Sequence, residues 1–270
     1  MGNHLSLLSL FRLALLFTIF LSPTFLGEPK KSQDGEVIYW NIGQGDFISF
    51  INRKICLIFD VGGSFRVPEN DLIELRDQCP GKRVKLFISH FDKDHISNYR
   101  RLMTYLNVEE SYFSHLDSRS KFGQKLLDQL KFQNSKIFEI RQGFRMTSEG
   151  IKLVCLWPPR GPLRKAENDR SLVLKLEVKK RSFLFMGDLP SKLEKKLPAV
   201  KAEVLKVGHH GSKYSSDIKF LERVHPAACV VSVGKGNTYG HPSDLALKRM
   251  GLAHCAILRT DTLGNVRFEL

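Results

Sequence analysis

The distribution of hydrophobic residues along the chain predicts short strands with helices between them. Near the start, residues 37–40, 47–51 and 55–60 are short apolar runs in a hairpin layout. Residues 84–89 form a further apolar run, which is typical of a strand buried on both faces. Later strands are expected at residues 151–156, 172–178, 183–186, 204–207, 229–233 and 256–258.

Amphipathic stretches between these runs predict helices. They lie at residues 96–106, 122–130, 216–224 and 243–250. Ser216 and Ser243 stand where they can serve as N-caps of the last two helices. Strands alternating with helices favour an α/β protein whose sheets are covered by helices. The length of 270 residues is ample for a full core in one large domain or two small ones.

The N-terminal segment is expected to direct export. Its strongest apolar stretch, residues 13–21, has the length of a signal-peptide core, and Pro23 and Gly27 break the pattern after it. About 20 apolar residues can also cross a bilayer. Residues 1–27 are therefore interpreted as a signal peptide or an N-terminal membrane anchor, and residues 28–35 as a linker. We expect a periplasmic or secreted protein, or one attached to the membrane by this segment.

The charge balance points to an anionic partner. The formal net charge is +14, from 42 Lys and Arg against 28 Asp and Glu. A positive field of this size favours nucleic acid, anionic lipid or anionic wall polymers. The alternative is that the basic residues only keep the protein soluble.

The five cysteines lack the spacing of a redox or zinc motif. Four of them lie in strand-like apolar runs, and no C-x-x-C sequence occurs. We therefore expect buried free thiols. The odd number also argues against a complete disulfide framework.

Four potential metal ligands lie within six residues directly after the strand at 84–89. They are His90, Asp92, Asp94 and His95, and a helix is expected from about residue 96. A strand that leads into a tight loop can hold such side chains close together. Imidazole and carboxylate groups in combination suit divalent transition metals. A polar loop with a chance acidic cluster is the less favoured alternative.

Two later strand ends carry further candidates. Asp188 follows Gly187 after an apolar strand, where one carboxylate can bridge two metal ions about 3.5–4 Å apart, although Gly-Asp is also common in simple turns. His209 and His210 follow the strand at 204–207. Adjacent side chains are expected to point in different directions, so one histidine should bind metal and the other should act on substrate. A neutral pair in an ordinary loop is the alternative.

Two more residues are placed like functional groups. His241 lies in a Gly-His-Pro loop, where it can act as an acid, contact a phosphate or merely cap the next helix. Asp60 ends the strand at 55–60 and can orient a metal ligand by hydrogen bonding to it. The remaining histidines are interpreted as structural or surface residues: His4, His115, His225 and His254.

These segments, in this order, resemble the metallo-β-lactamase superfamily, whose hallmark is H-x-H-x-D-H after a buried strand. The closer resemblance is to the hydrolase domain of ComEC-type competence proteins, which act in DNA uptake. It covers about residues 36–270. The segments that carry it are residues 41–46, 60–63, 89–95, 186–188, 206–212, 233–242 and 259–264.

The resemblance implies a four-layer αβ/βα sandwich with one or two divalent ions at one edge, either Zn²⁺ or Mn²⁺. It implies one ion on His90 and Asp92. The other ion would lie on Asp94 and His95, with Asp188 between the two. Either His209 or His210 would complete the second site.

The chain departs from the family pattern at two ligand positions. Asp92 replaces the usual second histidine of the hallmark, and its harder oxygen favours Mn²⁺ over Zn²⁺ without deciding between them. The usual middle histidine, roughly twenty residues before the Gly-Asp, is missing. Asn168 or Asp169 can substitute for it, or the first ion binds weakly.

The resemblance and the charge together predict an exported metal-dependent hydrolase, a phosphodiesterase or nuclease acting on DNA. Asp94 is expected to orient the attacking water as well as bind metal, and His241 to assist the leaving oxygen. Lys93 and Ser212 are expected to contact substrate. A same-fold hydrolase of another ester, a cell-wall phosphorylcholine ester or a lactam, is one alternative. A non-catalytic DNA- or envelope-binding module with a degraded metal site is another.

Overall fold

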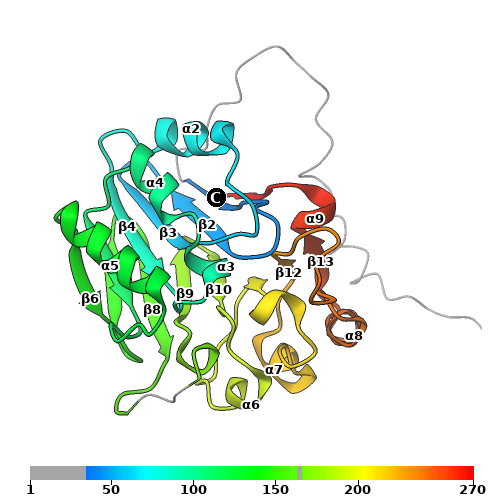
Figure 1. Cartoon of the computed structure of the whole chain (residues 1–270). Helices are drawn as coiled ribbons and strands as arrows, with labels where there is room; N and C mark the ends of the chain where they lie inside the picture. Colours follow the sequence, from blue (N-terminus) through cyan, green and yellow to red (C-terminus); the bar gives the residue numbers. More distant parts are fainter. Residues whose placement is uncertain (1–34, 163–165) are drawn as a thin grey trace, which may run out of the picture. The chain divides into compact units, whose positions relative to one another are not determined.

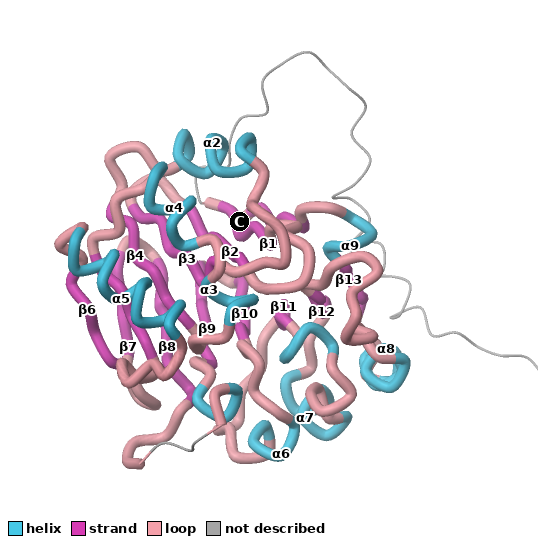
Figure 2. The backbone as a smooth tube through the Cα atoms, in the orientation of Figure 1, coloured by secondary structure: helices cyan, strands magenta, loops and turns pink. Residues whose placement is uncertain are grey.

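Two seven-stranded mixed sheets face each other in the computed structural model, which describes residues 35–162 and 166–270 (Figures 1 and 2). Sheet A has the order β14-β1-β2-β3-β4-β5-β6, and sheet B has the order β13-β12-β11-β10-β9-β8-β7. The strands of sheet A are β1 (Glu36–Tyr39), β2 (Phe47–Ile51), β3 (Ile55–Val61), β4 (Arg83–Ile88), β5 (Glu110–Phe113), β6 (Lys136–Glu139) and β14 (Val266–Glu269). Those of sheet B are β7 (Arg145–Ser148), β8 (Ile151–Trp157), β9 (Val173–Val178), β10 (Arg181–Phe185), β11 (Val204–Lys206), β12 (Ala228–Val231) and β13 (Ala256–Arg259).

Each sheet is antiparallel in one half and parallel in the other. In sheet A, β14, β1, β2 and β3 pair antiparallel, and β3 to β6 run parallel. In sheet B, β7 to β10 pair antiparallel, and β10 to β13 run parallel. Functional side chains commonly gather where parallel strands end. Strands β4, β10 and β11 all have parallel neighbours, and each of them ends directly before a segment with candidate ligands.

Helices cover the outer face of each sheet. Sheet A is covered by α2 (Glu69–Gln78), α4 (Tyr99–Tyr105) and α5 (Lys121–Phe132), and α3 (Lys93–Ile96) follows β4. Sheet B is covered by α6 (Ser191–Glu194), α7 (Ile218–Val224) and α8 (Asp244–Leu252), and α9 (Thr260–Leu263) follows β13. Two short 3₁₀ helices, η1 (Asn168–Arg170) and η2 (Gly208–Gly211), complete the elements. This confirms the predicted α/β class and the αβ/βα sandwich.

Three apolar layers hold the four structural layers together. Strand β3 shows why, because Cys56 and Ile58 point toward the helices while Leu57 and Phe59 point toward sheet B. Successive side chains of a strand alternate between its faces. A continuous apolar strand is therefore needed wherever both faces are covered.

The predicted elements match the structure with three differences. The helix expected at 96–106 is divided into α3 and α4, and Ser97 and Asn98 lie between them. Ser216 is not the N-cap of α7; that position belongs to Asp217, whose side chain accepts a hydrogen bond from the Lys219 amide. The Ser243 cap is confirmed, since its side chain accepts from the Ala246 amide. Strands β5, β6, β7 and β14 and helices α2, α6 and α9 were not predicted.

The expectation of free thiols is wrong for four of the five cysteines. Cys56 on β3 is bonded to Cys79 after α2, and Cys229 on β12 is bonded to Cys255 before β13. The Cα–Cα distances are 6.0 and 5.8 Å, within the range of disulfides. Only Cys155 is a free, buried thiol. The sequence could not reveal the pairing, because a helix separates the two cysteines of each pair along the chain. They meet only once that helix has packed on its sheet.

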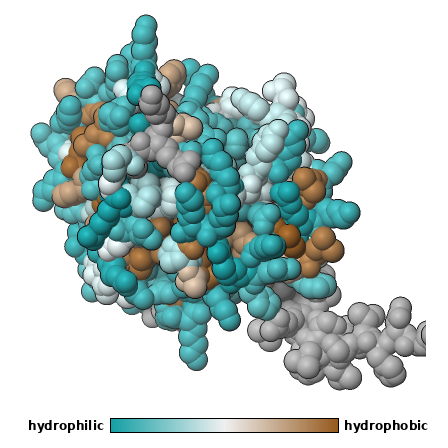
Figure 3. Space-filling view, turned by 90° about the horizontal axis from the view of Figure 1, so that it is seen from below, coloured by the Kyte–Doolittle hydropathy of each residue, from teal (hydrophilic) through white to brown (hydrophobic). Residues whose placement is uncertain are grey.

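The predicted signal peptide or anchor, residues 1–27, lies outside the described residues. Within residues 35–162 and 166–270, no helix combines the length and the apolar character needed to cross a membrane. Hydrophilic side chains dominate the face seen in Figure 3, with hydrophobic residues scattered among them. This agrees with the high charge of the chain.

Candidate metal centre

The side chains singled out in the sequence meet where strands of the two sheets end. His90 follows β4, and Asp94 and His95 lie in α3, on the side of sheet A. Asp188 follows β10 of sheet B, and His209 and His210 lie in η2 after β11 of the same sheet. The centre is therefore built from both halves of the molecule.

The buried carboxylate of Asp188 separates two groups of potential ligands. Its Oδ1 atom lies 3.1 Å from His95 Nε2 and 3.7 Å from His210 Nε2, which in turn is 3.3 Å from Asp94 Oδ2. Asp94, His95, Asp188 and His210 each offer one ligand atom, and these four atoms lie within 4.8 Å of one another. This is the spacing of a single metal site.

The other oxygen of Asp188 faces a second group. Asp188 Oδ2 lies 3.6 Å from His209 Nε2 and 4.0 Å from His90 Nε2. His90 Nε2 is also 3.4 Å from Asp92 Oδ2. The two histidines of the 209–210 pair thus approach different oxygens of the same carboxylate. Both rings lie at the centre, and the expected division of the pair into one metal ligand and one substrate contact stays a prediction.

A left-handed backbone allows both adjacent histidine side chains to approach Asp188. His209 has φ 49° and ψ 47°, and His210 has φ 52° and ψ 27°. Left-handed conformations cost a non-glycine residue of order 1–3 kcal/mol and gather at functional sites. Asp60, with φ 56°, is a third such residue beside the centre. The surrounding structure holds all three in place.

The hydrogen bonds of the imidazoles leave their Nε2 atoms as acceptors. His95 Nδ1 donates to Asp60 Oδ2 at 2.8 Å, and His210 Nδ1 donates to the Ser232 carbonyl at 2.9 Å. The Ser89 hydroxyl donates to Asp60 at 2.7 Å, so it can accept from His90 Nδ1 at 2.9 Å. Each ring then presents the lone pair of Nε2 to the centre. Such partners fix metal-binding tautomers.

The donor set fits a divalent cation. His90 Nε2, His95 Nε2, His210 Nε2 and Asp188 Oδ1 are buried and have no hydrogen-bond partner among the described residues. Four acceptors that face one another without a donor are unfavourable unless a cation lies between them. Nitrogen and carboxylate oxygen ligands suit Zn²⁺ and Mn²⁺ alike.

The pKa shifts of the side chains also indicate that this site favours a positive charge. Burial raises the pKa of Asp188, but His95 and His210 outweigh burial and hold that pKa well below its usual value. Burial lowers the pKa of His95, and Asp188 and Asp60 raise it well above the usual value. A bound cation would supply the charge that these imidazoles otherwise acquire by protonation.

The centre is open on one side. The side chains of Asp92, Asp94 and His209 are 48%, 32% and 31% exposed, whereas those of His90 and His95 are fully buried. Catalytic metal sites keep an accessible position for water and substrate. The exposed side of this centre provides that access.

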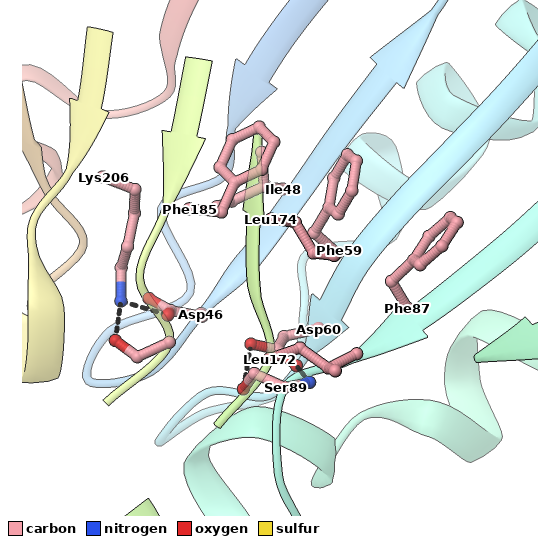
Figure 4. Close-up of a pocket in the computed structure, with 11 residues that line it drawn as sticks. Asp46, Ile48, Phe59, Asp60, Phe87, Ser89, Leu172, Leu174, Phe185 and Lys206 are labelled. Carbon is pink, nitrogen blue, oxygen red and sulfur yellow. Dashed lines mark hydrogen bonds and ion pairs between the residues drawn. The ribbon is translucent and has the colours of Figure 1, made fainter. Parts of the chain in front are cut away.

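A buried ion pair that was not predicted lies beneath the ligands. Lys206 Nζ contacts the Asp46 carboxylate and donates to the Gly187 carbonyl at 3.4 Å. Asp46 lies 3.7 Å from His95 Nδ1 and 3.6 Å from His210 Nδ1, on the side of both rings that faces away from Asp188. Figure 4 shows Lys206 and Asp46 side by side. The Asp46–Lys206 pair thus places a negative charge next to the Nδ1 atoms of both histidines.

The space around this pair is too small for substrate. Asp46, Asp60, Ser89 and Lys206 form its polar end, and Phe59 and other apolar residues form the remainder (Figure 4). The cavity has a volume of ≈ 10 Å³. That is about the room of one water molecule. The cavity therefore belongs to the support of the centre.

Close backbone approach fixes α3 against its neighbours. The Asp94 carbonyl accepts hydrogen bonds from the Asp46 and Gly63 amides at 3.0 and 3.1 Å. A Cβ atom on Gly62 would lie 1.6 Å from the same carbonyl oxygen. Only glycine allows this contact. Three of the sequence motifs that carry the resemblance, residues 41–46, 60–63 and 89–95, thus meet at the Asp94 carbonyl oxygen.

The loop with His241 borders the centre. The His241 ring lies 5.5 Å from the His209 ring and 6.4 Å from the His210 ring. Burial and these two histidines lower the pKa of His241 to about 4. His241 is therefore neutral at pH 7, which suits a hydrogen-bond partner better than a cationic acid.

Other predicted site residues lie outside the two ligand groups. Asp169 is buried, and its Oδ1 lies 3.2 Å from Lys192 Nζ; Asn168 precedes it in η1. Lys93 is exposed at the start of α3, with Nζ 5.9 Å from the centre of the Phe122 ring. Ser212 is buried, and its hydroxyl accepts from the Tyr214 amide at 3.3 Å.

A second pair of side chains, His115 and Glu167, contacts the residue after His90 and was also not predicted. His115 Nε2 lies 3.0 Å from Glu167 Oε1, which accepts from the Phe91 amide at 2.9 Å. Burial raises the pKa of Glu167, but the hydrogen bonds from His115 and Phe91 lower it to about 2. This supports the structural interpretation of His115. The hydrogen bond between the Phe91 amide and Glu167 joins residues far apart in the sequence, so the sequence pattern could not predict it.

No protein-family model matches the chain. It is 28% identical to ComE operon protein 3 of Bacillus subtilis over 94% of its length, and 27% identical to competence protein ComA of Neisseria gonorrhoeae over 90%. Those alignments cover 34% and 33% of the relatives. The chain thus spans about a third of the length of the curated relatives it matches.

Solved structures decide the fold. The metallo-β-lactamase fold protein YhfI of Bacillus subtilis superposes with a TM-score of 0.58 at 10% identity, over 88% of this chain and 100% of YhfI. The chain has the metallo-β-lactamase fold. Igni18, a metallo hydrolase of Ignicoccus hospitalis, matches with a TM-score of 0.55 at 12% identity, over 87% of this chain and 99% of Igni18. The metallo-β-lactamase fold and the similarity to competence proteins were both predicted, and both are confirmed.

Proposed function

We propose that the chain is a metal-dependent phosphodiesterase that cleaves DNA at a centre for two divalent ions. The observation that carries the proposal is the position of the Asp188 carboxylate, whose two oxygens face two different ligand groups. Similarity to competence proteins supports DNA as the substrate, and the net charge of +14 suits a phosphate backbone.

We assign one ion to Asp94, His95, His210 and Asp188 Oδ1. The other is assigned to His90, Asp92, His209 and Asp188 Oδ2. His209 then stands in for the middle histidine of the family pattern, which this chain lacks, and no role remains for Asn168 or Asp169. This assignment argues against a degraded site.

Divalent ions in such a centre activate water for attack and polarise a phosphoryl oxygen. The chain's own groups would position the reactants. Asp94, partly exposed beside the Asp188 carboxylate, is placed to orient the attacking water. His241, neutral and adjacent to His209, is placed to hydrogen-bond to the leaving oxygen. Exposed Lys93 and Lys213 lie next to the ligand segments, where they can contact phosphates.

We further propose that residues 36–270 form an exported hydrolase domain, preceded by a signal peptide or membrane anchor. The two disulfides support export, because such bonds persist in oxidising compartments and are rare in the cytosol. The periplasm or the outer surface of the cell meets this condition.

The test combines metal analysis with cleavage of labelled DNA. Purified protein should bind two Mn²⁺ or Zn²⁺ ions per chain and cleave DNA, and Asp188→Asn should lose both properties. Asp169→Asn is the matched control and should keep them. Protein that binds no transition metal after supplementation would favour the non-catalytic binding module. Metal-loaded protein that hydrolyses phosphorylcholine esters or lactams, and not DNA, would favour the other hydrolases.

A further inference from the structure

Tyr239 is a large aromatic residue that the core does not use. It lies in the loop between β12 and α8, and it is 69% exposed. The ring of His241 packs beside it in a near-parallel orientation, with 5.9 Å between ring centres and an angle of 21° between the planes. The ring is therefore supported from one side and accessible from the other.

The loop that carries Tyr239 is held by one side chain. Asn237 Oδ1 accepts hydrogen bonds from the Tyr239 and His241 amides at 3.2 and 3.0 Å. Asn237 Nδ2 donates to the Gly234 and His241 carbonyls at 2.9 and 2.6 Å. These bonds fix the backbone on both sides of the tyrosine. A positioned ring loses little freedom when it binds a ligand.

A row of rings connects Tyr239 to the metal centre. The ring of His241 lies between that of Tyr239 and that of His209, which is 5.5 Å from it. His209 in turn contacts Asp188. A group attached to a phosphate at the centre would thus extend past His241 toward the open face of Tyr239.

We propose that Tyr239 is a stacking platform for an unpaired base next to the phosphate at the metal centre. The proposal rests on the proposed function and specifies its substrate as single-stranded. Bases stack on exposed aromatic rings in sequence-tolerant binding of single strands, with an effect of about tenfold in affinity per base. A paired base offers no free face, because its neighbours in the duplex cover both. Tyr239 is a positioning residue and touches no reacting atom.

Charge favours a base over a choline group. Quaternary ammonium ions also bind aromatic rings, but they favour several rings arranged as a cage. Lys235, in the same loop, and Lys213, after the histidine pair, are both exposed. Their positive charge repels a choline cation and attracts the phosphates of a nucleic-acid strand.

The experiment measures binding separately from cleavage. Two fluorescent single strands of equal length are used, one of thymidines and one of abasic residues, both with slowly hydrolysed phosphorothioate linkages. Anisotropy of the full chain with Mn²⁺ should show about tenfold tighter binding of the thymidine strand. Tyr239→Ala should bind the thymidine strand as weakly as the abasic one. Tyr239→Trp should retain the preference.

Phe132→Ala is the matched control, because Phe132 is 83% exposed at the last residue of α5. It should bind both strands as wild type does. Equal binding of the thymidine strand by wild type and Tyr239→Ala would overturn the proposal. So would a wild type that binds neither strand, or that binds both equally. Displacement of the strand by phosphorylcholine from wild type, and not from Tyr239→Ala, would also overturn it by assigning the ring to a cation.

The two proposals fail in different ways. If a thymidine strand with ordinary linkages binds through Tyr239 and stays uncut, the proposed nuclease activity is contradicted and the platform stands. If Tyr239→Ala cuts this strand with unchanged kcat and KM, the platform is contradicted and the nuclease activity stands.

Discussion

In the proposed assignment, the two oxygens of Asp188 place the neighbouring histidines at different ions. His209 approaches Oδ2 together with His90, whereas His210 approaches Oδ1 together with His95. Replacing either histidine should therefore remove one ion and leave the other. This consequence follows from distances that sequence spacing does not contain.

His209→Gly should lower the metal content from two ions per chain to one, and His210→Gly should do the same at the other position. Glycine removes the imidazole and accepts the left-handed backbone at both positions without strain. Elemental analysis after dialysis measures the content. His254→Gly, at an exposed left-handed histidine, is the control and should keep two ions. Unchanged content in His209→Gly would contradict the assignment of that residue.

The Asp46–Lys206 ion pair, next to the candidate ligands, should be important for the stability of the protein. Both side chains are almost completely buried. Removal of one partner from a buried pair leaves an uncompensated charge, which destabilises a protein by about 3–5 kcal/mol. Replacement of both partners avoids that penalty.

Lys206→Met should thus lower the free energy of unfolding by about 3–5 kcal/mol. The double variant Lys206→Met/Asp46→Asn should lose less than the sum of the two single variants. Denaturant unfolding in the presence of a chelator measures both effects without a contribution from bound ions. Additive losses would show that the two side chains do not interact.

At the scale of elements, hydrophobic pattern predicted most strands, because the sandwich buries both faces of the central ones. Its failures have physical causes. Strands β6 and β7 are largely exposed or half-buried, so they lack a continuous apolar run. The break between α3 and α4 is stabilised by Asn98, whose side-chain Nδ2 donates hydrogen bonds to the Gly62 and Phe65 carbonyls. Helical spacing of apolar residues contains no sign of that contact.

The candidate site shows the same limit. Ligands that are adjacent in sequence, such as Asp94 and His95, could be recognised from their spacing and residue type. Asp46 and Lys206 lie 160 positions apart in the chain and meet only through the packing of the two sheets. The exposed ring of Tyr239 was likewise not predicted, because exposure depends on the finished fold.

Helix α6 holds the segment after the histidine pair. The carboxylate of Glu194 accepts hydrogen bonds from the Ser216 and Asp217 amides at 2.6 and 2.9 Å. Burial is the largest influence on its pKa and raises it to about 7, although these two bonds oppose the shift. The native protein thus keeps a proton on Glu194 at pH values where the unfolded chain has lost it.

Stability should therefore fall as the pH rises from about 4.5 to 7 and should change little above that range. Between those values the native state binds more protons at this site than the unfolded state does. The contribution is at most about 3 kcal/mol. Urea unfolding at a series of pH values, with Glu194→Gln as comparison, isolates it, because the glutamine does not titrate. Parallel profiles for the two proteins would contradict the role of Glu194.

At the scale of the whole molecule, each half of the sandwich has one disulfide. Cys56–Cys79 ties sheet A to the end of α2, and Cys229–Cys255 ties β12 to the segment between α8 and β13. Neither bond crosses between the halves. The residues of the candidate metal centre and the apolar layer between the sheets join them.

Four cysteines of the native protein should resist alkylation after denaturation without reductant, and Cys155 alone should react. Mass spectrometry counts the modified residues. Reduction should lower the free energy of unfolding by about 3 kcal/mol per bond, because each bond closes a loop of moderate length. Cys155→Ala should leave this loss unchanged. Alkylation of all five cysteines in protein prepared from the oxidising compartment would contradict both bonds.

The pairing of β14 with β1 has a consequence for how the chain reaches its folded state. The strand at Val266–Glu269 lies beside Glu36–Tyr39, so this edge of sheet A forms only when two segments far apart in the sequence meet. Contacts this distant in sequence form late and slowly. Strand β1 therefore has a neighbour on only one side until β14 arrives, and the final step of building sheet A joins two segments from opposite ends of the described fold.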